Sequence, residues 1–151
     1  MAYRKFKGEY NHSLDAKNRV FIPSKYREVL GSTFTVCHAS NNEQALYIYP
    51  SETWDELCEE MDELGRNATG EQKKLLERDR RDLYRNSDDA NMDTQGRITL
   101  SPAQCKYAGL KKDVLIIGNM KRLEIWDPEV FAEYDEQMHA DSPSGTPELN
   151  F

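Results

Sequence analysis

The chain lacks the features that mark membrane proteins, secreted proteins and disulfide-bonded domains. No apolar run approaches the roughly 20 residues of a membrane-spanning helix, and the basic stretch from Met1 to Lys7 is not followed by the apolar segment of a secretory signal. The three cysteines are well separated and form no Cys-x-x-Cys pair. An odd, scattered set of cysteines indicates a reducing compartment without a disulfide framework. We therefore expect a cytoplasmic protein with no membrane partner.

Catalytic and cofactor motifs are also missing. The sequence has neither a Walker-type phosphate loop nor the glycine pattern of a dinucleotide site. Its three histidines are scattered, and Cys37 and His38 are neighbours that would point to opposite faces of a strand, which makes them a poor metal pair. No nucleophile with a supporting base is visible. We expect no enzyme, no cofactor, no metal and no small-molecule substrate.

The charge distribution is more informative than the net charge. A formal net charge of −7, taken alone, argues against a nucleic-acid partner. However, residues 1–31 contain seven cations and three anions, whereas residues 51–65 contain seven anions and no cation. A basic face on an acidic body can still bind phosphate, and acidic flanks can suppress indiscriminate binding.

One short motif occurs twice, as LDAKNRVFI at residues 14–22 and as MDTQGRITL at residues 92–100. Both copies contain an aspartate, an arginine four positions later, and between them a residue that tolerates positive φ. The corresponding pairs are Asp15 and Asp93, Asn18 and Gly96, and Arg19 and Arg97. Such an internal repeat indicates one structural unit used twice, in two intertwined halves.

Each copy predicts a tight hairpin with a polar tip, followed by a half-buried strand. A three-residue tip would place the aspartate opposite the arginine. In the simpler interpretation, the aspartate satisfies turn amides and pairs with the arginine at the surface, which stabilises little. In the functional interpretation, the two arginines are presented to a polyanion. The presence of two copies ending in the same arginine favours the functional interpretation.

The elements after each motif also repeat, as β-α-β-β-α with the hairpin strand in front. Ser51, Ser101 and Asp127 are expected to cap helices, and Gly31 and Gly109 to end them. An additional helix in the first half begins with a possible capping box formed by Thr69 and Gln72. Its cations are interleaved with acids, so we interpret it as a solvated helix and not as a second polyanion surface. The expected segments are residues 6–52 (first repeat), 53–86 (helical insertion), 87–128 (second repeat), 129–139 (C-terminal helix) and 140–151 (mobile tail).

The chain resembles the MraZ proteins over roughly Phe6 to Met138. The first half matches the opening of that family at Gly8-Glu9-Tyr10, in the motif of residues 14–20, at Ile22-Pro23 and at Tyr26-Arg27. The second half matches it in the Asp-x-x-Gly-Arg motif, at residues 107–110 and at Ile125-Trp126. The tandem motif and its spacing are specific, whereas one Asp-x-x-x-Arg alone would be a weak match.

This resemblance implies an α+β fold of two tandem AbrB-like swapped-hairpin β-barrel units with flanking helices. It also implies a nucleoid-associated regulator that assembles into a ring. Such a ring would bind repeated sites on double-stranded DNA in the promoter of the division and cell-wall gene cluster, as a repressor. The implied contacts come from the two loops: Asp15, Lys17, Asn18, Arg19, Asp93, Gln95, Gly96 and Arg97. Arg4 and Lys5 are candidates for a flanking arm contact.

Two departures from the family pattern stand out. Asn18 replaces the usual glycine, and the helix start at residues 101–106 is less basic than expected, so the second loop is expected to contribute less. Two alternatives to DNA regulation stay open on the sequence. One is an antitoxin-like module whose main partner is a protein, and the other is a ring that scaffolds proteins without reading DNA sequence.

Overall fold

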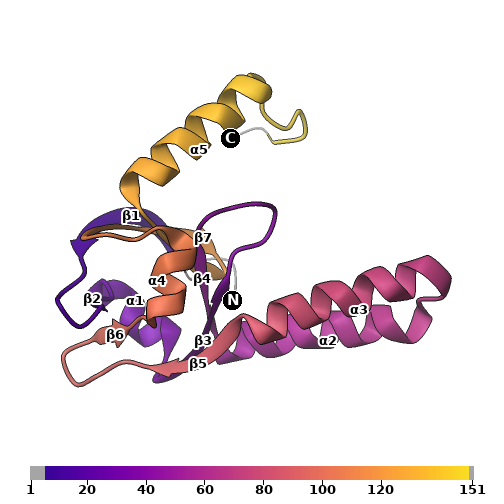
Figure 1. Ribbon diagram of the computed structural model, residues 1–151, viewed down its shortest axis with the longest axis horizontal. Helices are drawn as coiled ribbons and strands as arrows, with labels where there is room; N and C mark the ends of the chain where they lie inside the picture. The colour runs from indigo at the N-terminus through magenta and orange to yellow at the C-terminus, as the bar shows by residue number, and fades with distance from the viewer. Residues whose placement is uncertain (1–5, 150–151) are drawn as a thin grey trace.

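The computed structural model describes residues 6–149, so Arg4 and Lys5 lie outside the described residues. The chain has an α+β fold in which helices flank antiparallel strands (Figure 1). In chain order the elements are β1 (Phe6–Ser13), β2 (Arg19–Phe21), α1 (Ser24–Leu30), β3 (Thr33–His38), β4 (Leu46–Pro50), α2 (Ser51–Asn67), α3 (Gly70–Arg85), β5 (Ser87–Asn91), β6 (Arg97–Thr99), α4 (Pro102–Ala108), β7 (Asp113–Met120), β8 (Arg122–Trp126) and α5 (Pro128–Asp141). The repeated order of strands and helices that the sequence predicts is therefore confirmed.

The helix ends agree with the sequence in the second half and differ in the first. Ser101 and Gln104 form a reciprocal capping box, and Asp127 accepts hydrogen bonds from two backbone amides at the start of α5. Ser51, in contrast, is the first helical residue of α2, and its hydroxyl donates to the carbonyl of Thr33. The hydroxyl is thus engaged with β3 and does not cap its own helix. The expected capping box at Thr69 is also wrong, because its side chain makes no capping hydrogen bond.

The strands on either side of each loop do not pair with each other, so the expected simple hairpins are wrong. The eight residues of β1 pair in antiparallel register with the eight residues of β7, and β2 pairs with β6. The order of the larger sheet is β1-β7-β8-β4-β3-β5. β7 pairs with β1 along its full length, which the three-residue β2 could not do. Among the described strands, β1 and β5 end this sheet and are not paired with each other, so no closed barrel forms.

Apolar side chains from both halves fill one core. Val20 and Ile22 of the first half and Ile98 and Leu100 of the second are almost completely buried in the same cluster. A second cluster surrounds Trp126 and holds the start of α5 against the sheet. The two repeats are therefore interlocked, because neither could bury its motif strand without the other.

Two elements extend from this body. The helices α2 and α3 form an antiparallel pair that extends to one side, and α5 projects away from the top of the body in this view (Figure 1). No residue of α3 is buried, which agrees with a solvated helix. None of the described helices has the length and apolar character needed to cross a lipid bilayer.

Candidate nucleic-acid interface

The first loop is a turn closed by backbone and side-chain hydrogen bonds to one aspartate. The amide of Asp15 donates to the carbonyl of Arg19 (3.0 Å), and the amide of Asn18 donates to the carbonyl of Asp15 (3.0 Å). Oδ1 of Asp15 accepts the amides of Lys17 and Arg19, both at 2.9 Å. Oδ2 accepts Nε of Arg19 at 2.6 Å. The aspartate thus fixes the turn and the direction of the arginine together.

The second loop repeats this geometry. Asp93 and Arg97 are joined by the same backbone pair at 2.8 Å, and the amide of Gly96 donates to the carbonyl of Asp93 at 3.0 Å. Oδ1 of Asp93 accepts the amides of Gln95 and Arg97, both at 2.9 Å, and Oδ2 accepts Nε of Arg97 at 2.8 Å. The sequence repeat is therefore a structural repeat down to individual hydrogen bonds.

Positive φ at the fourth position of each turn makes this geometry possible. Asn18 has φ of 59° and Gly96 has φ of 82°, as the sequence predicts. Most L-residues are strained in this region, and asparagine tolerates it better than most. The replacement of glycine by asparagine in the first copy therefore leaves the turn intact.

The two loops lie side by side because the strands that follow them pair with each other. In the β2–β6 ribbon, Val20 is opposite Ile98, and both are fully buried. Successive side chains of a strand point to opposite faces, so the neighbouring residues point away from the core. These outward residues are Arg19, Phe21, Arg97 and Thr99. The ribbon thus presents both motif arginines on one outer face, on the side of the molecule away from the α2–α3 pair (Figure 1).

Hydrogen bonds and charge tie the two loops together. The amide of Ile22 donates to the carbonyl of Gly96, and the amide of Leu100 donates to the carbonyl of Asn18, both at 2.9 Å. Nη1 of Arg97 lies 3.9 Å from Oδ2 of Asp15. The paired loops are therefore one rigid unit and not two independent turns.

The two aspartates stay ionised because the loops donate hydrogen bonds to their carboxylates. The pKa of Asp15 is lowered to about 2, chiefly by the backbone hydrogen bond from Arg19, with further contributions from the Arg19 side chain and the Lys17 amide. The pKa of Asp93 is lowered in the same way, first by the Arg97 amide. Both groups therefore carry a full negative charge at neutral pH, where they orient arginines whose Nη atoms remain available.

The eight loop residues expected to contact DNA differ in exposure. Asp15, Lys17, Asp93 and Gln95 are exposed, and Asn18, Arg19 and Arg97 are half-buried. Gly96 is buried, because the guanidinium of Arg27 lies on it: a Cβ at Gly96 would be only 2.3 Å from Cζ of Arg27. Arg27 also donates from Nε to the carbonyl of Ile22 at 2.9 Å.

In the sequence, Arg27 was identified only as part of the resemblance to the family, and no contact with the loops was predicted for it. The difference between the two copies indicates this contact, because glycine is needed where another group packs directly against the backbone. The first copy has Asn18 at that position and the second has Gly96.

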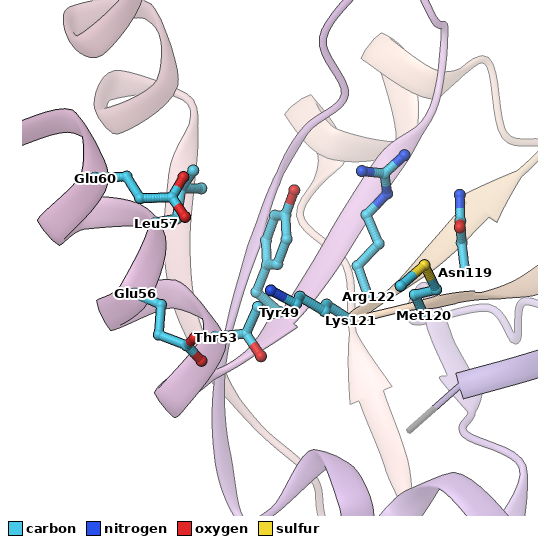
Figure 2. A pocket seen from close by; sticks show the side chains of 9 residues that line it. All are labelled: Tyr49, Thr53, Glu56, Leu57, Glu60, Asn119, Met120, Lys121 and Arg122. Carbon is cyan, nitrogen blue, oxygen red and sulfur yellow. The ribbon is translucent and has the colours of Figure 1, made fainter. Parts of the chain in front are cut away.

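A cavity of about 280 Å³ lies elsewhere, between α2 and the turn from β7 to β8 (Figure 2). Its walls are formed by Tyr49, Thr53, Glu56, Leu57, Glu60, Asn119, Met120, Lys121 and Arg122. This lining contains no residue of the two loops, no histidine and no cysteine. Within residues 6–149, no group of three or more potential metal ligands is present. The paired loops, in contrast, bring two arginines together at the surface, where they can bind an anion.

Comparison with known proteins connects these loops to one family. The chain matches the model of the family described as MraZ protein, antitoxin-like, over residues 5–77 and 83–148. A protein of Clostridium tetani named transcriptional regulator MraZ is 38% identical over 135 residues, which is 87% of each chain. Relatives with the same name occur in Acetivibrio thermocellus (38% over 143 residues, 91% of this chain and 92% of the relative) and Clostridium acetobutylicum (36% over 131 residues, 87% of each). Each matched segment contains one of the two loops.

Proposed function

The chain belongs to the MraZ family, and on that premise we propose that it regulates transcription by binding double-stranded DNA with its paired loops. The family is one of transcriptional regulators and not of enzymes. The observation that carries the proposal is the outer face of the β2–β6 ribbon, where both motif arginines are held by ionised aspartates. A two-stranded ribbon fits the major groove of B-DNA.

Each part of the loop has a distinct role in this mechanism. Arg19 and Arg97 use Nε to bind their aspartates, which leaves their terminal nitrogens for the edge of a guanine or for a phosphate. Lys17 is exposed at the tip of the first turn and contacts phosphate. Asp15, Asn18, Asp93 and Gly96 act by shaping the turns, and Gln95 reaches the backbone of the DNA as a neutral donor. Arg4 and Lys5 add a flanking contact from the preceding arm.

Assembly supplies the affinity that one loop pair lacks. Two arginines and one lysine give few contacts for each chain, and the chain as a whole carries a formal net charge of −7. A ring that repeats the loops at fixed intervals raises the effective concentration on repeated sites. We therefore propose a ring-shaped homo-oligomer in the cytoplasm, associated with the nucleoid. It would repress the promoter of the division and cell-wall gene cluster.

The exchange of strands between the halves supports a finer description of the fold. β1 leaves its own loop to pair with β7, and the motif strands pair across the halves. We propose that this is the swapped-hairpin arrangement of AbrB-like units. In this description residues 6–52 and 87–128 are the two repeats, residues 53–86 the insertion, residues 129–139 the C-terminal helix and residues 140–151 the tail.

A second candidate function has support from a different surface. The α2–α3 pair exposes Leu64 on the acidic helix α2, and Leu75 and Tyr84 on α3, where six cations are interleaved with four anions. Exposed apolar side chains of this kind can mark a protein-binding surface. The second candidate is therefore an antitoxin-like role in which a protein, and not DNA, is the main partner.

The two functions are separated by binding measurements with wild-type protein. The titration compares DNA from upstream of its own gene with a scrambled duplex of equal length, at several salt concentrations. The DNA-regulator proposal predicts salt-sensitive binding that prefers the upstream duplex. Equal binding to both duplexes, or none, would contradict it, and co-purification of a protein held by the α2–α3 pair would favour the second candidate.

A further inference from the structure

Arg27 is a third arginine at the paired loops and is not part of either motif. It comes from α1 of the first half, but its guanidinium lies on the second loop, against Gly96. Its Nε donates to the carbonyl of Ile22, whose amide in turn donates to the carbonyl of Gly96. The side chain is thus held against one short section of backbone that joins the two halves.

The terminal nitrogens of Arg27 are not used by this contact. Among residues 6–149, the only hydrogen bond of its side chain is the one from Nε, and it makes no ion pair with an acidic side chain. Arg19 and Arg97, in contrast, are both neutralised in part by aspartates. Arg27 therefore brings an unneutralised positive charge to the base of the second loop, with its donors still free.

Arg27 provides the second loop with a cation that its own turn lacks. The first turn contains Lys17, and the equivalent position of the second turn is the neutral Gln95. In the other direction, the residue equivalent to Arg27 in the second half is Cys105, which carries no cationic group for the first loop. Each loop therefore has one cation in addition to its motif arginine. In the first loop this cation is Lys17, from the turn itself, and at the second loop it is Arg27, from the opposite half.

We propose that Arg27 is a preorganised DNA-phosphate ligand that acts beside the second loop, in place of the lysine which that loop lacks. This rests on the proposed binding of DNA by the paired loops. Because Nε already fixes the side chain, little rotamer freedom is lost when a phosphate binds Nη1 and Nη2. Gly96 has no side chain because a Cβ would occupy the space of the guanidinium.

The test is the salt dependence of binding to the upstream duplex, measured by fluorescence anisotropy between about 50 and 200 mM salt. The variants are Arg27→Ala, Arg27→Lys, Arg19→Ala and, as a charge-matched control on the exposed face of α3, Arg81→Ala. Each phosphate contact contributes about 0.9 to the slope of log K against log salt concentration. For each loop pair that binds the DNA, Arg27→Ala should reduce the magnitude of this slope by about 0.9. It should also weaken binding to the upstream duplex by about tenfold. Arg27→Lys should keep the slope, and Arg81→Ala should behave as wild type.

A purely structural role would give a different pattern. If Arg27 only supported the second loop, Arg27→Ala would lower the melting temperature and leave the salt slope unchanged, and the inference would be wrong. If Arg19→Ala abolishes binding while the slope of Arg27→Ala equals that of wild type, the inference fails and the proposed function stands. If the wild type does not bind the upstream duplex at all, the proposed function and this inference both fail.

Discussion

Arg97 of the second loop holds its Nη1 atom 3.9 Å from Oδ2 of Asp15 in the first loop. The carboxylate of Asp15 therefore faces two arginines, its own partner Arg19 at 2.6 Å and the arginine of the other half. This contact joins two motifs that lie far apart in the sequence. It implies that damage to one loop is felt by the other.

The substitution Asp15→Asn tests whether the aspartate positions the arginines. Removal of a negative charge near DNA would by itself strengthen binding to phosphates. We expect instead that binding to the upstream duplex weakens by about tenfold, because Arg19 loses the acceptor that orients it and Arg97, still held by Asp93, loses the nearby charge of Asp15. Anisotropy titrations of Asp15→Asn and of Glu133→Gln, which makes the same charge change on exposed α5, measure the difference. Tighter binding by both variants would show that Asp15 acts only through its charge.

The pH dependence of the loops follows from the lowered pKa of their aspartates. A carboxylate whose pKa is lower in the folded state stabilises the fold above its unfolded pKa and loses that contribution as the pH falls through its folded pKa. For Asp15 this window lies between the usual value of 3.8 and about 2. We therefore expect the loop to be intact throughout pH 5 to 8. Carboxyl ¹³C resonances of Asp15 in an NMR titration provide the measurement, and a midpoint near 3.8 would contradict the hydrogen-bonded geometry.

A pair of glycine substitutions separates backbone strain from the contact with Arg27. Gly96 and Gly31 have the same φ of 82°, but nothing lies within 4 Å of a Cβ placed at Gly31. Alanine at Gly96 should cost about 1–2 kcal/mol of folding free energy, and alanine at Gly31, whose ψ of −177° places it in a region essentially restricted to glycine, should cost at least as much. Only Gly96→Ala should also weaken DNA binding, because it displaces the Arg27 guanidinium. Thermal melts and DNA titrations of both variants would contradict this account if their affinities fell equally.

The sequence predicted the loops better than the pairing of the strands around them. The turns at Asn18 and Gly96 follow from local chemistry, since few residues adopt positive φ. The alternation of Val20 and Ile22 likewise determines which face is buried, but it does not determine which strand lies alongside. The partnership of β1 with β7 depends on the global fold, so simple hairpins were expected and an exchange between halves was found.

Contacts between distant residues were equally inaccessible to sequence reasoning. The guanidinium of Arg27 meets Gly96 only after α1 and β6 have docked in the shared core. Ser51 provides a second case. A serine hydroxyl at this position can accept a hydrogen bond from its own helix or donate one to a neighbouring element. The position of β3 determines that it donates to the carbonyl of Thr33. Local motifs therefore identified the candidate site, and tertiary packing added the residues that support it.

A buried polar cluster away from the loops supports a prediction about stability. Glu124 is 6% exposed and accepts hydrogen bonds from Trp126 Nε1 (3.0 Å), Arg122 Nη2 (2.8 Å) and Asn119 Nδ2 (2.9 Å). Glu124→Ala leaves these donors without their acceptor, which should cost about 2–4 kcal/mol. Chemical denaturation measures the free energy of unfolding of Glu124→Ala and of a control, Glu133→Ala on exposed α5. The control should change this free energy by less than about 0.5 kcal/mol. Equal effects of the two variants would show that water replaces Glu124 without penalty.

The affinities of Arg19→Ala, Arg97→Ala and the double variant for the upstream and scrambled duplexes test directly whether the paired loops bind DNA. The paired-loop account predicts that each single variant loses selectivity for the upstream duplex while its melting temperature and oligomeric state stay those of wild type. It also predicts that the double variant binds both duplexes equally weakly. Selective binding that survives in the double variant would contradict the account and place the DNA-binding surface elsewhere on the chain.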